Sequence, residues 1–149
     1  MFHLYLSTNL EKSILIEIIK DYFIEEYLMK INIGELYDDN ESSDDEIIIE
    51  YSRYDCINVF VTSLWVYVHN KTIKDKFIFF DFLCFYSRNC HCKVLVSTFI
   101  DSYTYLMIDE EGLLYSVEID GSNDEPCPKI FSKKIISKEL AINLITQIL

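Results

Sequence analysis

Segments rich in β-branched and aromatic residues fill much of the chain, and they constrain its fold more than any other feature. Runs of Ile, Val, Phe, Tyr and Thr are typical of β-strands, because these side chains pack well on a pleated surface. The sequence therefore predicts strands over 2–7, 47–53, 57–69, 76–87, 92–98, 103–108 and 113–119. Only three glycines and two prolines occur, so regular elements should dominate the fold.

An amphipathic helical pattern flanks these strands near each end of the chain. From Leu10 to about Lys30, apolar residues recur at three- and four-residue spacings, with charged residues on the other side. Near the C-terminus, Ser137 can cap a helix whose apolar face begins at Leu140. We therefore expect an α+β fold, in which one mainly antiparallel sheet of about five to seven strands is flanked by an N-terminal and a C-terminal helix. Because no repeat or linker is visible, residues 1–149 should form a single domain.

One hairpin is predicted more sharply than any other local element. The segments 103–108 and 113–119 are separated by Asp109-Glu110-Glu111-Gly112, and a glycine in a left-handed conformation can close such a turn. Two short polar stretches, 70–72 and 88–89, are predicted as further turns between strands.

The formal net charge of −12 comes from two windows of the sequence. The windows 31–52 and 94–128 each contain eight acidic residues and no Lys or Arg, whereas basic residues outnumber acidic ones in the rest of the chain. A field of this sign repels nucleic-acid backbones and anionic membranes, and it attracts basic proteins. We therefore expect a basic protein partner, without direct binding to nucleic acid or membranes.

The residues expected to contact that partner are acids of the two windows and tyrosines beside them. Interface energy tends to come from Tyr and Trp, whereas charges contribute steering and specificity. The set is Glu35, Tyr37, Asp38, Asp39, Glu41, Asp44, Asp45, Glu46, Tyr103, Asp109, Glu110, Glu111, Asp120, Asp124 and Glu125. Tyr51, Tyr54 and Tyr105 are further candidates, whereas Trp65 is expected in the core. An alternative interpretation is that the acidic loops only keep an aromatic-rich protein in solution.

Motifs of the common enzyme classes are missing from the sequence. Glycines at 34, 112 and 121 alone cannot build a phosphate-binding loop, and no nucleophile-elbow or zinc-protease signature occurs. Cys90-His91-Cys92 resembles a metal site, but zinc ligands usually need two-residue spacers and no second pair complements it. We expect free thiols at a turn and strand edge there, and no catalytic residue, metal or cofactor.

Clustered or isolated carboxylates have simple structural interpretations. Asp109-Glu110-Glu111 and Asp44-Asp45-Glu46 do not follow the EF-hand pattern, and consecutive carboxylates in a turn are more often solvated. Asp81 lies between two phenylalanines of the predicted strand 76–87. It is expected to be a buried, hydrogen-bonded carboxylate with a structural role.

The N-terminus and the cysteines favour a cytoplasmic protein. The first residues lack a basic segment and a small-residue cleavage site, and the longest apolar stretch, 77–86, is too short to span a membrane. The five cysteines are odd in number and lack repeated spacing, which fits reduced thiols. They are Cys56, Cys84, Cys90, Cys92 and Cys127.

Two segments resemble bacterial immunity proteins, which neutralise secreted polymorphic or contact-dependent growth inhibition toxins. These segments are the hairpin sequence from Tyr105 to Val117 and the closing helix from Ile136 to Ala141. The resemblance covers about the last third of the chain and identifies no subfamily. It implies a one-to-one inhibitor that covers the active site, or a nearby surface, of a toxin domain, with a cationic nuclease as the expected partner.

Two other functions fit the same residues. A phage-type inhibitor that mimics DNA would also be acidic, and the genomic neighbourhood would separate the two, since an immunity gene lies directly downstream of a toxin gene. A small enzyme with scattered catalytic residues would need a cysteine to meet His3, His69 or His91 in space.

The first acidic window yields a direct prediction. Reversing Asp38, Asp39, Asp44 and Asp45 to Lys should slow association with a basic partner and weaken its dependence on salt, because these charges would no longer steer the encounter. Stopped-flow association rates over a series of salt concentrations measure both effects. Unchanged kinetics would remove this segment from the binding surface.

Overall fold

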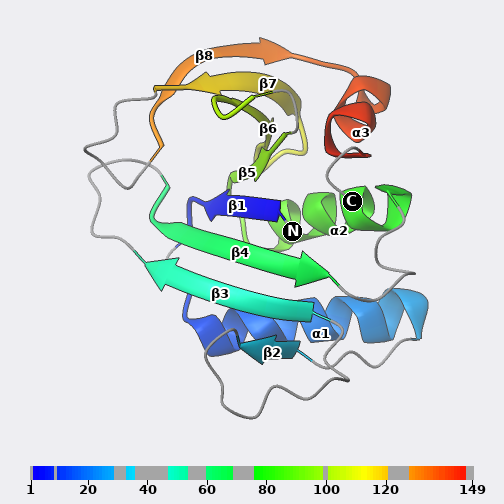
Figure 1. Cartoon of the computed structure of the whole chain (residues 1–149). Coiled ribbons are helices and arrows are strands. Elements are labelled where there is room, and N and C mark those ends of the chain that lie inside the picture. Colours follow the sequence, from blue (N-terminus) through cyan, green and yellow to red (C-terminus); the bar gives the residue numbers. More distant parts are fainter. Residues whose placement is uncertain are drawn as a thin grey trace.

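The computed structural model describes residues 2–8, 10–28, 33–35, 47–53, 60–68, 76–98, 101–120 and 128–146. In these ranges, eight strands form one sheet in the order β2-β3-β4-β1-β5-β6-β7-β8, accompanied by three helices (Figure 1). The strands are β1 (Phe2–Leu6), β2 (Ile33–Glu35), β3 (Ile47–Arg53), β4 (Thr62–Val68), β5 (Val94–Ser97), β6 (Thr104–Ile108), β7 (Leu114–Ile119) and β8 (Ile130–Ile135). The helices are α1 (Lys12–Tyr27), α2 (Lys76–Asn89) and α3 (Lys138–Thr146).

Antiparallel pairing dominates the sheet. Seven consecutive strands, from β3 at one side to β8 at the other, are joined by antiparallel ladders, and β2 adds a parallel pairing with β3. The expected α+β class, with one mainly antiparallel sheet and a helix near each end, is confirmed. The C-terminal helix also begins as predicted, because the Ser137 hydroxyl accepts the backbone N–H of Leu140 at 3.2 Å.

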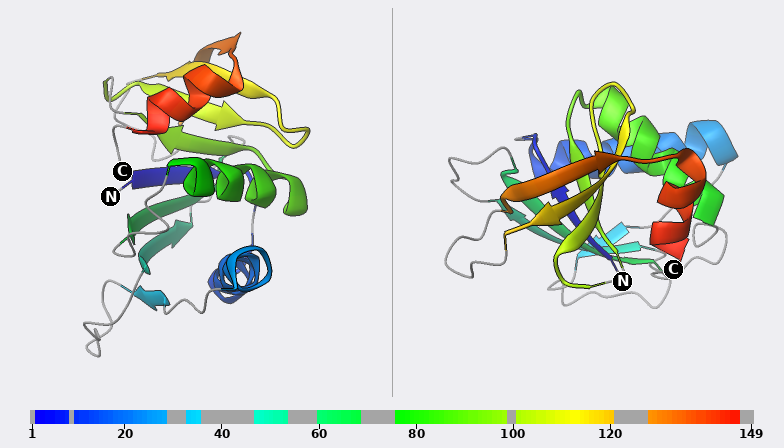
Figure 2. Two further views of the ribbon diagram at one scale, coloured as in Figure 1. Left: turned by 90° about the vertical axis from the view of Figure 1, so that its right-hand side faces the viewer. Right: turned by 90° about the horizontal axis from the view of Figure 1, so that it is seen from above.

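The main core lies between one face of the sheet and the three helices. Leu6 and Leu106 from the strands meet Phe23 of α1, Leu83 of α2 and Ile145 of α3, and all five side chains are fully buried. The helices lie side by side on this face, with α2 between α1 and α3 (Figures 1 and 2). Burial of this face is the main favourable contribution to folding, at about 25 cal/mol per Å² of apolar surface.

The predicted strand 76–87 is wrong, because this segment is helix α2. Its aromatic and β-branched residues favour a strand locally, but Phe79, Leu83 and Tyr86 recur at helical spacing and face the sheet together. The predicted turn at 88–89 is wrong for the same reason, since both residues belong to the last turn of the helix. No helix within the described residues is long and apolar enough to cross a membrane.

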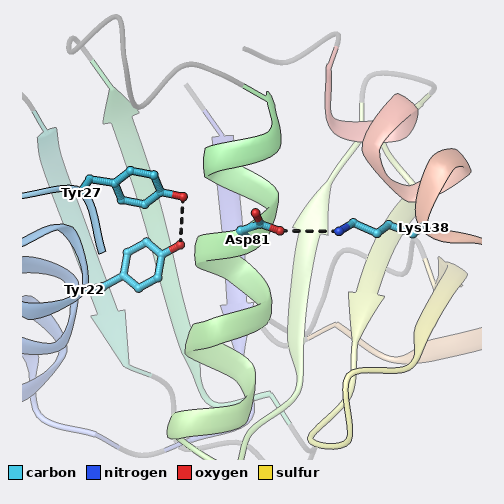
Figure 3. A network of polar contacts seen from close by, with 4 residues as sticks. All are labelled: Tyr22, Tyr27, Asp81 and Lys138. Atoms are coloured by element: carbon cyan, nitrogen blue, oxygen red, sulfur yellow. Dashed lines mark hydrogen bonds and ion pairs between the residues drawn. The ribbon is translucent and has the colours of Figure 1, made fainter. Parts of the chain in front are cut away.

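Asp81 is not the buried carboxylate that a strand would make it. On α2 it is exposed and faces α3, where its Oδ1 lies 3.8 Å from Nζ of Lys138 (Figure 3). Both side chains are more than half exposed, so solvent screens the pair and it contributes little stability. On the α1 side, the hydroxyls of Tyr22 and Tyr27 lie 3.5 Å apart (Figure 3).

Two strands were not predicted from the sequence. Three-residue β2 is too short to give a pattern, and β8 combines apolar residues with lysines without clear alternation. All residues of β8 are exposed, and its outer edge has no strand partner among the described residues. The predicted turn at 70–72 lies outside the described residues.

The end of α2 is tied to two neighbouring segments through one serine. The N–H of Cys92 donates to the carbonyl of Ser87 at 3.0 Å, and His91 takes a left-handed φ of 47°, which is the usual geometry of a helix end followed by a reversal. The fully buried Ser87 hydroxyl lies 2.9 Å from the carbonyl oxygen of Cys92 and 2.6 Å from that of Asp109. A single donor therefore links α2, the start of β5 and the β6–β7 turn.

Removing this donor should loosen the fold measurably. We expect Ser87→Ala to lower the free energy of unfolding by about 1–3 kcal/mol, because two carbonyl oxygens lose their shared donor in a buried place. Urea unfolding measures the change. Ser132→Ala is the matched control, since its exposed hydroxyl donates to the Glu118 carboxylate and its loss should cost under about 0.5 kcal/mol. Equal losses in the two variants would contradict the linking role of Ser87.

Candidate binding surface

The β6–β7 turn presents two carboxylates from a well-fixed loop. The Asp109 carboxylate accepts the N–H groups of Glu111 at 3.0 Å and Leu113 at 2.8 Å, and Gly112 closes the turn at a φ of 85°. Glycine suits that position because it has no Cβ to clash there. Asp109 therefore builds the turn, whereas Glu110 and Glu111 are exposed and free to meet a partner.

Apolar side chains lie beside this turn. Ile135 of β8 is 62% exposed and lies opposite Tyr115 in the β7–β8 register, and Leu113 is 42% exposed. Tyr115 is half-buried, and its hydroxyl donates to Oδ2 of Asp109 at 3.4 Å. These residues form the surface that we name the hairpin patch, which consists of Asp109, Glu110, Glu111, Leu113, Tyr115 and Ile135.

Other predicted contact residues of the second window lie at the opposite end of the hairpin. Tyr103 and Asp120 are exposed and meet there, because the N–H of Ile119 donates to the carbonyl of Tyr103. The five-residue strand β6 separates them from the turn by roughly 15 Å, at about 3.3 Å per residue. The exposed Asp101 caps this end, and the N–H groups of Tyr103 and Thr104 that it accepts lower its pKa.

The first acidic window is largely outside the described residues. Glu35 belongs to β2, at the edge of the sheet farthest from β8, so five strands lie between it and β7. The expected contact residues outside the described part are Tyr37, Asp38, Asp39, Glu41, Asp44, Asp45, Glu46, Asp124 and Glu125. The predicted contact residues that are described thus lie in three places. The exposed Lys133 of β8 brings a positive charge into the hairpin patch, because its Nζ lies 5.1 Å from the centroid of the Tyr115 ring.

The sheet face opposite the helices is rich in aromatic residues, and the sequence did not indicate that they share one face. Trp65, expected in the core, is half-buried on this second face and stacks on His3, with ring centroids 4.1 Å apart. Tyr105 is buried on the same face, in a small cluster with Leu95 and Met107. Strand alternation could have indicated the pairing of His3 with Trp65, but only with knowledge of which strands are neighbours.

Tyr51 is a structural residue and not an exposed anchor. It is half-buried on the helix side, where its hydroxyl donates to the backbone carbonyl of Leu10 at 2.9 Å. Tyr54 lies outside the described residues.

His3 is held as a neutral side chain. It is almost fully buried, its Nε2 lies 2.5 Å from the Ser63 hydroxyl, and Tyr5 and Trp65 flank its ring. Burial lowers its pKa from the usual 6.5 to about 4. The described cysteines lie away from it, since Cys84, Cys90 and Cys92 belong to α2 and the turn that follows, which pack against the other face of the sheet.

The cavities and the metal-ligating residue types among the described residues suggest little further chemistry. A cavity of about 30 Å³ between the sheet and helices α1 and α2 has a lining of mainly apolar side chains, among them Phe23 and Val66. A groove of about 300 Å³ between α1 and α2 is lined by polar residues such as Glu26 and Arg88. Among the described residues, no three His, Cys, Asp or Glu side chains are grouped so that they could hold a metal ion.

Comparisons with protein-family models, with curated proteins and with solved structures give no match to this chain.

The neutral state of His3 makes stability depend on pH. Below pH 6.5 the unfolded chain takes up a proton on this imidazole, whereas the folded protein does so only near pH 4. Stability should therefore fall as the pH drops through this window, by up to about 1.4 kcal/mol per pH unit from this group. His3→Gln should flatten the dependence in urea unfolding between pH 7 and 4.5, and His91→Asn, at an exposed position, should not. Equal slopes in all three proteins would contradict the assignment.

Proposed function

We propose that this chain is an immunity protein, which binds a cognate bacterial toxin domain one to one and neutralises it through the hairpin patch. The observation that carries the proposal is a turn fixed by Asp109, which presents Glu110 and Glu111 beside the exposed Ile135. Turns of this kind lose little conformational entropy on binding, so more of the contact energy becomes affinity. The sequence resemblance of the same hairpin to immunity proteins supports the same function.

The two kinds of side chain in the patch have separate roles. Ile135 and Leu113 supply apolar surface that can be buried at the centre of an interface, whereas Nζ of Lys133 lies over the Tyr115 ring. Glu110 and Glu111 supply charge that speeds the encounter with a basic partner and fixes its orientation. A nuclease domain is a suitable partner, because its substrate groove is basic in order to hold phosphates, and carboxylates can occupy the same positions.

The alternatives predict different behaviour. A DNA mimic needs an uninterrupted series of carboxylates, and the cationic Lys133 lies among the described side chains of this surface, with its Nζ 5.1 Å from the centroid of the Tyr115 ring. If acidity only keeps the protein in solution, reversal of any exposed acid should have the same small effect.

Charge reversal at the turn tests the steering role. We expect Glu110→Lys with Glu111→Lys to lower the association rate at low ionic strength by about tenfold or more, with a difference that shrinks as salt is added. The partner is the protein encoded immediately upstream, co-expressed and purified with this chain, and stopped-flow fluorescence gives the rates. Glu17→Lys with Glu25→Lys, on the exposed side of α1, makes the same change in net charge and should alter the rate far less.

The apolar centre of the patch is tested through dissociation. Ile135→Ala should speed dissociation of the complex by about tenfold, equivalent to about 1.4 kcal/mol, while the association rate changes little. Ile24→Ala is the matched control, since Ile24 is 44% exposed on α1 and lies outside the patch. Absence of a complex with the upstream protein, or equal effects of patch and control variants, would overturn the proposal.

A further inference from the structure

The single tryptophan of the chain lies in a row of side chains that crosses three neighbouring strands. In the sheet, β4 lies between β3 and β1 (Figure 1). Trp65 of β4 lies directly opposite Glu50 of β3 on one side and directly opposite His3 of β1 on the other. Residues directly opposite in an antiparallel ladder project from the same face, with Cβ atoms about 4.5–5.5 Å apart. Glu50, Trp65 and His3 therefore share the sheet face opposite the helices.

The two sides of the Trp65 ring have different neighbours. His3 stacks on one side, with ring centroids 4.1 Å apart and ring planes inclined by 7°. The two rings thus follow each other along the row, so the other side of the Trp65 ring is turned toward β3 and Glu50. Trp65 and Glu50 are both half-buried, which leaves part of each side chain in contact with solvent. Because burial lowers the pKa of His3 to about 4, the stacked imidazole adds no positive charge at neutral pH.

The Glu50 carboxylate and the Trp65 ring favour the same kind of ligand. No described residue forms a hydrogen bond or an ion pair with the carboxylate, and Glu50 belongs to an acidic window without Lys or Arg. In the part of the chain that the structure describes, no ammonium or guanidinium group lies over the Trp65 ring either. A carboxylate attracts a cation by its charge, and an indole ring attracts one by its quadrupole. The row is therefore complementary to a positively charged group.

Another ring on the same sheet face provides an internal comparison. Nζ of Lys133 in β8 lies 5.1 Å from the centroid of the Tyr115 ring in β7. Lys133 lies opposite Val117, which is buried in the small cluster on the face opposite the helices, so this pair and Trp65 share that face. At Tyr115 the chain supplies the cation itself. At Trp65, which has the stronger ring for a cation, the neighbour across the ladder is a carboxylate.

The chemistry of the row favours arginine over lysine. A guanidinium group is planar, so it can stack on an indole ring while its N–H groups donate to a carboxylate. A lysine ammonium is compact and strongly hydrated, and it lacks this planar fork of donors. Tyr67 follows Trp65 by two residues on β4, is half-buried, and borders the row on the same face at about 7 Å along the strand.

We propose that Trp65 and Glu50 form a binding site for one arginine side chain of a partner protein. The guanidinium group stacks on the side of the Trp65 ring that His3 leaves open, and its N–H groups donate to the Glu50 carboxylate. The site lies four strands away from β7, or roughly 19 Å at about 4.8 Å per strand, and is thus separate from the hairpin patch. It does not rest on the function proposed for that patch.

The single tryptophan makes the site directly observable. In a proton–nitrogen correlation spectrum, Trp65 gives the one indole N–H signal of the chain. The full-length protein is titrated at neutral pH and constant ionic strength with N-acetyl-arginine amide, and in parallel with the lysine and citrulline derivatives. Citrulline has nearly the shape of arginine without its charge. The arginine derivative should shift the signal along a saturable curve, the lysine derivative should bind about threefold more weakly, and the citrulline derivative should cause no saturable shift.

A conservative substitution tests the role of the carboxylate. Glu50→Gln keeps the shape of the side chain, and it should raise the Kd for the arginine derivative about tenfold because a charged acceptor is lost. Glu118→Gln is the matched control, since it makes the same change in charge on β7. Glu118 lies opposite Thr104 and follows the buried Val117, so it projects toward the helix side of the sheet. This control should leave the Kd unchanged.

Three results would overturn the proposal. The first is the absence of a saturable shift of the indole signal with the arginine derivative. The second is equal binding of the lysine or the citrulline derivative, and the third is an equal Kd in Glu50→Gln and the parent protein. None of these results bears on the hairpin patch, because all are measured on this protein with small molecules and without a toxin domain.

Discussion

The position of α2 on the sheet is the constraint on which the rest of the structure depends. Its apolar side fills the space between α1 and α3, and Phe79, Leu83 and Tyr86 are all buried there against the strands. Without this central helix, the flanking helices would leave the middle of the sheet face exposed to water, at a cost of about 25 cal/mol per Å² of apolar surface. The helix therefore fixes both the thickness of the core and the place where the chain must turn back into β5.

The end of α2 also determines how the β6–β7 turn is held. The chain reverses at His91, and the Ser87 hydroxyl joins this reversal to the carbonyl of Asp109. Two sets of hydrogen bonds thus hold the hairpin turn. The carbonyl of Asp109 accepts the buried Ser87 hydroxyl, and the Asp109 carboxylate accepts N–H groups of the turn itself. A surface of exposed side chains can be rigid when the backbone beneath it has such partners.

The sequence indicated most of the fold where local patterns and tertiary packing agree. The strands of the β6–β7 hairpin, α1 and the Ser137 cap were predicted within a few residues, because periodicity or turn chemistry determines them locally. Helix α2 was predicted as a strand because its aromatic and β-branched residues favour a strand locally. The helical spacing of its apolar residues determines the structure only through their contact with the sheet. The candidate site was predicted in part: the acidic turn followed from the sequence, but the exposed Ile135 beside it depends on a strand, β8, whose pattern is too irregular to identify.

Net charge alone is a poor guide to where a protein binds, and this chain illustrates the reason. Acids of one sequence window can lie at opposite ends of a hairpin, as Glu110 and Asp120 do at the two ends of β7. At physiological salt the Debye length is about 8 Å, shorter than that strand, so each group acts on a partner nearly independently. The charge that matters to an approaching surface is therefore the charge within one screening length of an apolar centre. By that criterion the charges of the proposed surface are those of Glu110 and Glu111 beside Leu113 and Ile135, together with Lys133, whose Nζ lies 5.1 Å from the centroid of the Tyr115 ring. The whole-chain value of −12 describes none of this arrangement.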